Sequence, residues 1–160
     1  MNSKIRKIFT LGVIFSMVLV FFTGCRKNTG IHFEFGDIAN FSTEVHDEHP
    51  TVTILIKSTD ELKQFCDDSG IIYKGEKYDE AFFSHSALLI YFFVNESTMI
   101  SIHIDNLTVG NDTLTINITR RVPRAGYVDE VEYCSYVFEI NQSVVADINN
   151  INVSKKDKNK

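Results

Sequence analysis

A run of eight consecutive apolar residues, Ala87 to Val94 (ALLIYFFV), constrains the fold of this chain more than any other segment. Its length and its aromatic content favour a strand over a helix. Successive side chains of a strand point to opposite faces of a sheet, so an apolar run without alternation requires cover on both faces. The sequence therefore predicts a central strand with a packed layer on each side.

Further segments have patterns typical of strands around such a core. Thr51 to Lys57 (TVTILIK) is rich in β-branched residues, whereas Met99 to Val109 and Thr113 to Arg121 alternate between apolar and polar side chains. Gly110-Asn111-Asp112 joins the last two segments and predicts a β-hairpin. The other predicted strands are Ile31 to Phe35, Tyr133 to Ile140 with Cys134, Tyr136, Phe138 and Ile140 on its inner face, and an edge strand from Asn150 to Val153.

Two short helices are predicted beside the strands. Ser58 and Glu61 have the S-x-x-E spacing of a capping box, and apolar residues at helical spacing follow them. Tyr78 to Phe83 is expected to form a shorter helix with Asp79 as its N-cap. The fold class is therefore mainly β, an antiparallel sheet or sandwich with one or two short helices packed on it. The remaining predictions are a helical turn at Ser143 to Ile148 and a loop at Phe41 to Pro50.

The N-terminal segment has the pattern of a bacterial lipoprotein signal. Three basic residues precede a 15-residue apolar run from Ile8 to Phe22, and no acidic residue precedes Cys25. A membrane-spanning helix needs about 20 apolar residues, whereas the apolar part of a signal peptide has about 7–15. Phe22-Thr23-Gly24-Cys25 resembles a lipobox, so we expect cleavage before Cys25 and lipidation of its thiol. The alternative is an uncleaved signal anchor with an unmodified cysteine.

These patterns predict four parts of the chain. Residues 1–24 are a lipoprotein signal peptide, residues 25–30 a lipidated tether, residues 31–153 a single β-rich extracytoplasmic domain, and residues 154–160 a disordered basic tail. The lipid on Cys25 is expected to hold the protein at the extracytoplasmic face of a bacterial cell membrane, because a diacylglyceryl group supplies two acyl chains.

The charge balance argues against one class of partner. Without residues 1–24 the formal charge is (16 − 3) − 21 = −8, because the leader contains three basic residues and no acidic one. Binding to nucleic acid needs a basic stripe for phosphate contacts, so no nucleic-acid partner is expected. The one dense basic run, Lys155 to Lys160, is typical of a solvated terminal tail.

Cys66 and Cys134 remain as thiols once Cys25 carries lipid. Outside the cytoplasm they can form a disulfide, which would close a loop of 134 − 66 = 68 residues and contribute about 4 kcal/mol of stability. The alternative is two buried free thiols, which are common in protein cores. Neither cysteine has CxxC or zinc-finger spacing, so a thiol redox site or a structural zinc site is not expected.

His46-Asp47-Glu48-His49 is the densest group of potential metal ligands, with His32 upstream. Catalytic zinc sites usually draw two histidines from a helix at i, i+4, whereas these two are at i, i+3 in a segment without helical pattern. A solvated acidic loop therefore explains them, and no resident metal or other cofactor is expected. A metal-binding lipoprotein that uses the His46–His49 loop is the alternative to the main hypothesis below.

Two further pairs were considered for catalysis. Ser84 and His85 are sequence neighbours, which does not by itself place a hydroxyl productively against a ring nitrogen. His103 and Asp105 lie on the polar side of an alternating strand, where such residues are expected in a half-exposed sheet. Walker A, Rossmann and G-x-S-x-G patterns do not occur in the chain. The sequence therefore predicts a protein that is not an enzyme.

The segment from Arg120 to Tyr127 is the candidate recognition loop. It contains Arg120, Arg121, Arg124, Gly126 and Tyr127 in a chain that is otherwise acidic. Loops held by a rigid β scaffold are common binding sites, and Arg and Tyr are enriched among residues that dominate binding energy. The alternative is that these arginines pair with the acidic residues that follow, Asp129, Glu130 and Glu132.

Three motifs in this order carry a resemblance: S-T-x-E-L-x-x-F from Ser58, Y-D-E-x-F-F from Tyr78 and R-x-V-P-x-x-G from Arg120. Over residues 58–153 the chain resembles small uncharacterised lipoproteins of Firmicutes. More distantly, it is similar to the C-terminal domain of the protease complex subunit family. The second resemblance implies a non-catalytic partner of an extracellular protease, with Arg121, Pro123 and Gly126 as pattern residues; Arg120 matches the R-x-V-P spacing more closely than Arg121 does. The main hypothesis is thus a lipid-anchored, non-enzymatic binding module that contacts another cell-envelope protein.

Overall fold

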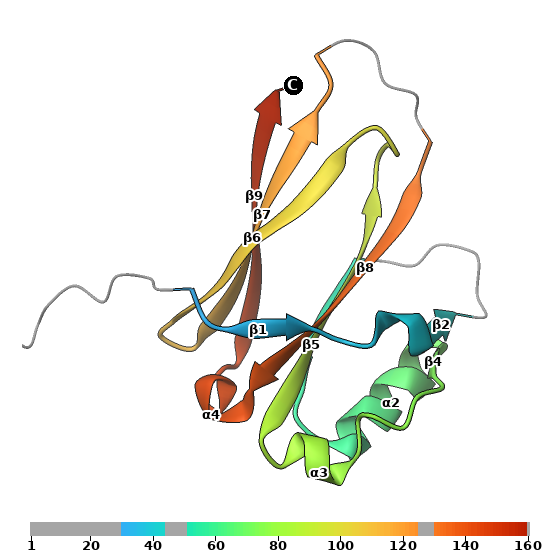
Figure 1. Ribbon diagram of the computed structural model, residues 1–160, viewed down its shortest axis with the longest axis vertical. Helices are drawn as coiled ribbons and strands as arrows, with labels where there is room; N and C mark the ends of the chain where they lie inside the picture. Colours follow the sequence, from blue (N-terminus) through green and yellow to red (C-terminus); the bar gives the residue numbers. More distant parts are fainter. Residues whose placement is uncertain (1–29, 44–50, 125–129, 160) are drawn as a thin grey trace, which may run out of the picture.

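The computed structural model describes residues 30–43, 51–124 and 130–159, which form a β-sandwich with helices on one side (Figure 1). The larger sheet is antiparallel and consists, in spatial order, of β1 (Phe33–Phe35), β8 (Glu132–Asn141), β5 (Ser86–Asn95) and β3 (Val52–Ile56). The second sheet consists, in spatial order, of β6 (Ser101–Gly110), β7 (Thr113–Val122) and β9 (Asn150–Asn159). Helices α2 (Thr59–Ser69) and α3 (Glu80–Phe83) cover the free face of the larger sheet. The predicted mainly β fold with short packed helices is confirmed.

Strand β5 is the centre of the structure, as its apolar sequence predicts. It pairs antiparallel with both β3 and β8. Leu89 and Tyr91 belong to the core between the two sheets, whereas Leu88 and Ile90 belong to the core under the helices. All four side chains are fully buried. Both faces of β5 are therefore covered.

The predicted hairpin is formed by β6 and β7, and the left-handed Asn111 lies in its turn with φ 55°. The register shifts between Ile104 and Asn106, so Asp105 forms a bulge. The bulge returns Leu107 to the inner face, where it is fully buried, although it lies three residues after the inward-facing Ile104. An uninterrupted strand would point Leu107 into water, since alternate side chains face opposite sides.

Both predicted helix starts are confirmed by their side-chain caps. The Ser58 hydroxyl accepts a hydrogen bond from the Glu61 N–H at 3.1 Å, and the Glu61 carboxylate accepts one from the Lys57 N–H at 2.6 Å. Gly70 ends α2 in the left-handed conformation with φ 67°, which a glycine adopts without a steric penalty. Asp79 caps α3 by accepting from the Phe82 N–H at 2.8 Å.

The structure corrects two predicted segments. Residues 41–43, expected in a loop, form β2 (Phe41–Thr43), which pairs with β4 (Ile71–Tyr73) beside α2. Residues 154–159, expected in a disordered tail, continue β9 to Asn159, because the backbone of β7 offers them a parallel hydrogen-bonding partner along its whole length. The remaining short elements are η1 (Ile38–Asn40) and α4 (Gln142–Val145), the latter within the predicted helical turn.

Tyr78 joins the segment that follows β1 to strand β8 of the larger sheet. Its sequence context does not indicate this role. Its hydroxyl accepts a hydrogen bond from the Asp37 N–H at 2.6 Å and donates one to the Glu139 carboxylate at 3.0 Å. Lys77 completes the group with an ion pair to Glu139 at 2.6 Å. Burial, followed by the negative charge of Glu139, raises the pKa of the Tyr78 hydroxyl well above its usual range, so it stays a donor.

Because β5 is buried on both faces, shortening a side chain on either face should reduce the stability of the domain by a similar amount. Leu88→Ala and Leu89→Ala should each reduce the free energy of unfolding by about 2–5 kcal/mol, because each leaves a cavity in a different core. Val94→Ala, at a side chain that is 38% exposed on the same strand, should have a much smaller effect. Denaturant unfolding measures all three values. A small loss for either leucine would contradict one of the two covering layers.

Candidate functional site

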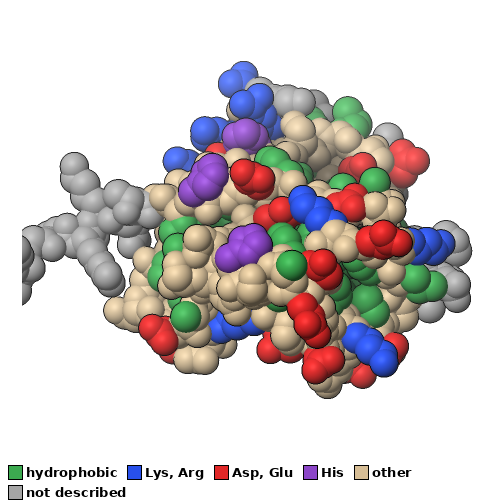
Figure 2. All heavy atoms as spheres, turned by 60° about the horizontal axis from the view of Figure 1, so that its bottom comes forward, with side chains coloured by type: hydrophobic (Ala, Val, Ile, Leu, Met, Phe, Trp, Pro, Cys, Tyr) green, Lys and Arg blue, Asp and Glu red, His purple; other side chains and the backbone are tan. Residues whose placement is uncertain are grey.

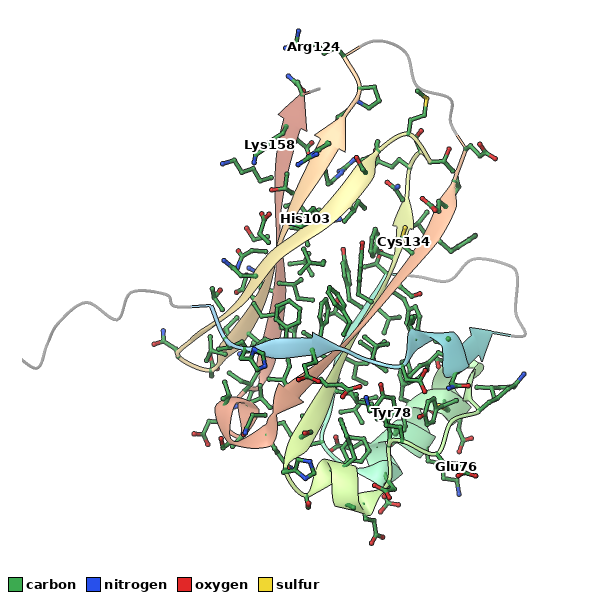
Figure 3. The ribbon with its side chains drawn as sticks, in the orientation of Figure 1. Glu76, Tyr78, His103, Arg124, Cys134 and Lys158 are labelled. Atoms are coloured by element: carbon green, nitrogen blue, oxygen red, sulfur yellow. The ribbon has the colours of Figure 1, made fainter. Side chains whose placement is uncertain are left out.

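The candidate arginine segment lies at the end of the sandwich where the two sheets diverge, and Figure 3 shows Arg124 and Lys158 at this end. Only part of the segment lies outside regular secondary structure, because β7 continues through Val122 and includes Arg120 and Arg121. Arg124 follows as an exposed residue. Gly126 and Tyr127 lie outside the described residues, so their contribution to the site stays a prediction.

Arg120 is turned inward and belongs to the framework of the domain. It follows Ile116 and Ile118 on the core-facing side of β7, and its side chain is only 18% exposed. Its guanidinium lies 3.4 Å from the Glu96 carboxylate and 3.6 Å from the Asp157 carboxylate. Arg120 therefore connects the turn after β5 to β9. The prediction that it lies in an exposed recognition loop is wrong, because strand alternation directs it between the sheets.

The acidic partners of the loop arginines also differ from the predicted ones. Within the described residues, Glu130 accepts a hydrogen bond from the Thr98 hydroxyl at 3.4 Å, and Glu132 accepts one from the Asn95 amide at 3.4 Å. Neither glutamate forms an ion pair with a described arginine. Asp129 lies outside the described residues. Arg121 and Arg124 are therefore not neutralised by these two glutamates.

Four exposed cations at this end of the three-stranded sheet are candidates for a binding surface: Arg121, Arg124, Lys156 and Lys158. Lys155 is also exposed, but it lies on the same side of β9 as Asp157. Arg121 is directly opposite Lys158 in the parallel β7–β9 register, and Thr119 is opposite Lys156. Asp157, which separates the two lysines in sequence, points inward to Arg120. We call these four residues the cationic end. The sequence analysis missed the two lysines because it expected their segment to be disordered.

On the core side of Arg120, the Cys134 thiol and the side chains of Tyr91 and Tyr136 lie between the two sheets. Figure 3 labels Cys134 at this position. Burial, the charge of Glu132 and a hydrogen bond to its carboxylate raise the pKa of the Cys134 thiol to about 11. Burial and the nearby thiol also raise the pKa of Tyr91, whose hydroxyl is buried without a hydrogen-bond partner in the described part of the chain. At neutral pH the thiol is therefore protonated and is a poor nucleophile.

Cys66 and Cys134 do not form the disulfide that an extracytoplasmic location would permit, and both are free thiols. Cys66 lies on α2 and packs against the core under the helices, whereas Cys134 lies on β8 and packs against the core between the sheets. The larger sheet separates them, and a disulfide requires Cβ atoms about 3.5–4.5 Å apart. The alternative of two partly buried free thiols is the correct one.

A shallow groove of about 440 Å³ lies between α2 and β4 on the helical side of the molecule. Its lining includes Leu62, Cys66, Ile71 and Tyr73. Burial raises the pKa of the Cys66 thiol, followed by the charge of Asp67 in the same direction, so this thiol is also protonated at neutral pH. The groove exists because β4 returns beside α2, and the sequence analysis did not predict β4.

The histidines considered for catalysis are exposed and lie in separate places. Asp105 accepts a hydrogen bond from the Thr119 hydroxyl at 2.7 Å, and no bond joins it to His103 among the described residues. Ser84 Oγ lies 3.2 Å from His85 Nδ1, closer than neighbouring positions alone require, but the Ser84 hydroxyl donates to the Ala81 carbonyl at 2.7 Å. The proton that a base would remove is therefore held by a backbone acceptor.

The His46–His49 loop and the lipobox with Cys25 lie outside the described residues, so both stay predictions. His32, the other histidine considered for a metal, is exposed, and its Nε2 lies 4.0 Å from the Glu34 carboxylate. No group of three or more potential metal ligands occurs in the part of the chain that the structure describes. Among the same residues, no helix is long and apolar enough to cross a membrane.

Comparison with known proteins gives no match: no family model, no curated protein and no solved structure is similar to this chain. The resemblance to Firmicutes lipoproteins and to the protease complex subunit family therefore stays a prediction.

The protonated state of Cys134 gives a pH-dependent prediction. In a Cys66→Ser background, alkylation by iodoacetamide should increase with a midpoint near pH 11, because the thiolate is the reactive form. Glu132→Gln should lower this midpoint, since it removes a negative charge that disfavours the thiolate. The midpoint should stay above 9.0, because burial is the larger cause. Glu130→Gln is the matched control, and a parent midpoint at or below 9.0 would contradict the site.

The inward position of Arg120 predicts a local change in β9. Arg120→Gln should speed amide hydrogen exchange in residues 154–159 by about fivefold, which corresponds to about 1 kcal/mol for a partly exposed ion pair. Arg121→Gln, one residue further along β7, should leave this exchange unchanged because its side chain points outward. Exchange measured by mass spectrometry distinguishes the two. Equal effects of both substitutions would contradict the link between Arg120 and Asp157.

Proposed function

We propose that this protein is a lipid-anchored, non-enzymatic binding module of the bacterial cell envelope, and that its cationic end contacts an anionic component of that envelope. The segregation of charge carries the proposal. In a chain with more acidic than basic residues, the exposed side chains of Arg121, Arg124, Lys156 and Lys158 share one end of one sheet. Such a concentration of one charge sign on a protein of the other sign favours an oppositely charged partner.

The scaffold supports recognition at this end. Arg121 and Lys158 are neighbours on hydrogen-bonded strands, so their separation is set by the sheet. Arg120 holds β9 to the rest of the domain through Asp157, which positions the lysines on either side of it. Cations on a rigid surface lose less conformational freedom on binding than cations on an unstructured tail, which favours affinity. An acidic surface of another envelope protein, such as an extracellular protease, is one partner of the required chemistry.

The non-enzymatic part of the proposal is supported by how the reactive groups are held. Burial and Glu132 keep the Cys134 thiol protonated, and Cys66 is protonated for a similar reason. The Asp105 carboxylate accepts a hydrogen bond from the Thr119 hydroxyl, and none joins it to His103 among the described residues. These described thiols and this carboxylate are thus protonated or hydrogen-bonded within the domain. These contacts favour a binding role over catalysis.

Site-specific photo-crosslinking tests the surface. A photoreactive amino acid replaces Arg121 or Arg124 in the full-length protein in its own membrane, and the matched controls replace Lys63 or Lys74, which are exposed on the helical side. We expect adducts, either to lipid or to another protein, from the cationic end and only background from the controls, because the partner is held by the local positive charge. Adducts of equal yield from both sides, or from neither, would refute the proposed surface.

The anchor has its own measurement in the same strains. Cys25→Ser should release the protein from the membrane fraction or leave its leader uncleaved, because no thiol remains to receive the lipid. Mass spectrometry of the parent protein should find a lipidated Cys25 at the N-terminus. An intact leader on the parent protein would contradict the anchor without bearing on the cationic end.

A further inference from the structure

We infer that the anionic component is the lipid surface itself, and that the domain lies with the outer face of its three-stranded sheet against a membrane rich in anionic lipid. The outer face consists of the outward-pointing side chains of β6, β7 and β9. The inference rests on the proposed function and deepens it, because it names the partner of the cationic end. Three independent features carry it: the composition of the face, the exit point of the tether and the charge of the opposite layer.

The outer face is polar and uncharged over most of its length. Register and alternation arrange it in rows across the three strands, and from the hairpin turn the first three are Gly110–Thr113–Asn150, Thr108–Thr115–Asn152 and Asn106–Asn117–Ser154. Asn117 donates hydrogen bonds to Asn106 at 2.8 Å and to Thr108 at 3.2 Å, which holds these side chains along the sheet. Such a face can contact lipid headgroups through hydrogen bonds without burying a charge.

The positive charge of the face is concentrated in its last two rows, His103–Thr119–Lys156 and Ser101–Arg121–Lys158. The nearest acidic side chain on this face is Asp105, which accepts a hydrogen bond from Thr119. Asp157 points to the opposite side of β9, where Arg120 neutralises it. The field of Arg121, Lys156 and Lys158 is therefore directed outward from the sheet.

The tether leaves the domain at the same face. The Ile31 N–H donates to the Leu107 carbonyl at 2.8 Å, which fixes the start of the domain beside β6. A Cβ placed on Gly30 would lie 3.3 Å from the Cβ of Asn106, a residue of the outer face. Residues 25–30 extend at most about 18 Å, so a lipid on Cys25 keeps the Asn106 row within that distance of the membrane without by itself pressing the row against it. The cations lie about 13 Å further along β7 and supply a second point of contact.

The opposite layer has the charge that a membrane of anionic lipid repels. The exposed acidic residues of α2, α3 and their connection are Asp60, Glu61, Asp67, Asp68, Glu76, Asp79 and Glu80, against Lys63, Lys74 and Lys77. Figure 2 shows most of the acidic side chains in the lower and right parts of the view with a few basic ones among them, and a group of basic side chains at the upper left. When the domain docks through its outer face, these acidic residues are a full domain width from the lipid. Their repulsion from anionic headgroups is then screened, because the Debye length is about 8 Å at physiological salt.

The test measures the orientation of the full-length lipidated protein in vesicles. A fluorescent amino acid replaces Ser154 on the outer face or Asp68 on α2, and lipids with a spin label at the headgroup act as quenchers. In phosphatidylglycerol vesicles the probe at position 154 should be quenched and the probe at position 68 should not. In phosphatidylcholine vesicles both should be weakly quenched, because the anchor remains but the charge attraction is lost.

A matched pair of double substitutions completes the experiment. Lys156→Gln/Lys158→Gln should lower the ratio of docked to undocked protein about 25-fold, since each cation near an anionic surface contributes roughly fivefold. Lys63→Gln/Lys74→Gln removes the same charge from the helical side and should leave the ratio unchanged. Circular dichroism confirms that both variants keep their sheets.

Each result assigns the partner. Quenching at position 154 that needs both phosphatidylglycerol and the two lysines supports docking on lipid. Equal quenching at positions 154 and 68, or quenching that does not change with lipid charge, overturns it. Protein adducts from Arg121 in the crosslinking experiment, without lipid-dependent quenching, assign the cationic end to an acidic protein and overturn this inference while the proposed function stands. Absence of both signals refutes the cationic end as a binding surface.

Discussion

Burial of β5 on both of its faces is the constraint on which the rest of the structure depends. Leu89 and Tyr91 must be covered by the three-stranded sheet, and Leu88 and Ile90 must be covered by helices, because either row of large apolar side chains would be costly in water. This requirement sets the order of the layers. It also decides which surfaces remain free for partners: the outer face of β6, β7 and β9 on one side, and the exposed surface of α2 and α3 on the other.

Strand alternation then sorts the charges of the free sheet. Along β7 and β9, Arg120 and Asp157 point between the sheets, whereas Arg121, Lys156 and Lys158 point outward. The inward pair stabilises the end of β9, and the outward cations share one surface with little opposing charge. A basic run whose charges would point in all directions in a disordered tail thus places Lys156 and Lys158 on one side of a sheet, with Asp157 on the other. In the proposed lipid-anchored protein, the position of Gly30 beside Asn106 would bring this surface to the side of the lipid.

The sequence was most informative where one side chain and its neighbours in the chain decide the outcome. Helix starts at Ser58 and Asp79 and the turn at Asn111 follow from local hydrogen bonds and backbone preferences, and the structure confirms them. The candidate site was less predictable. The direction of Arg120 depends on how far β7 extends, and the lysines of β9 join the site only through a parallel pairing with a strand that is distant in sequence.

By itself, the sequence determined that the chain has a central buried strand, a β-hairpin, two capped helices and an acidic balance, because these depend on local pattern and composition. The tertiary structure decided that Cys66 and Cys134 lie on opposite sides of the larger sheet, that Arg120 is internal, and that residues 154–159 form a strand. Each of these outcomes depends on contacts between segments far apart in the chain. Neither hydrophobic period nor turn chemistry specifies such contacts, because both describe a segment and not the neighbour against which it packs.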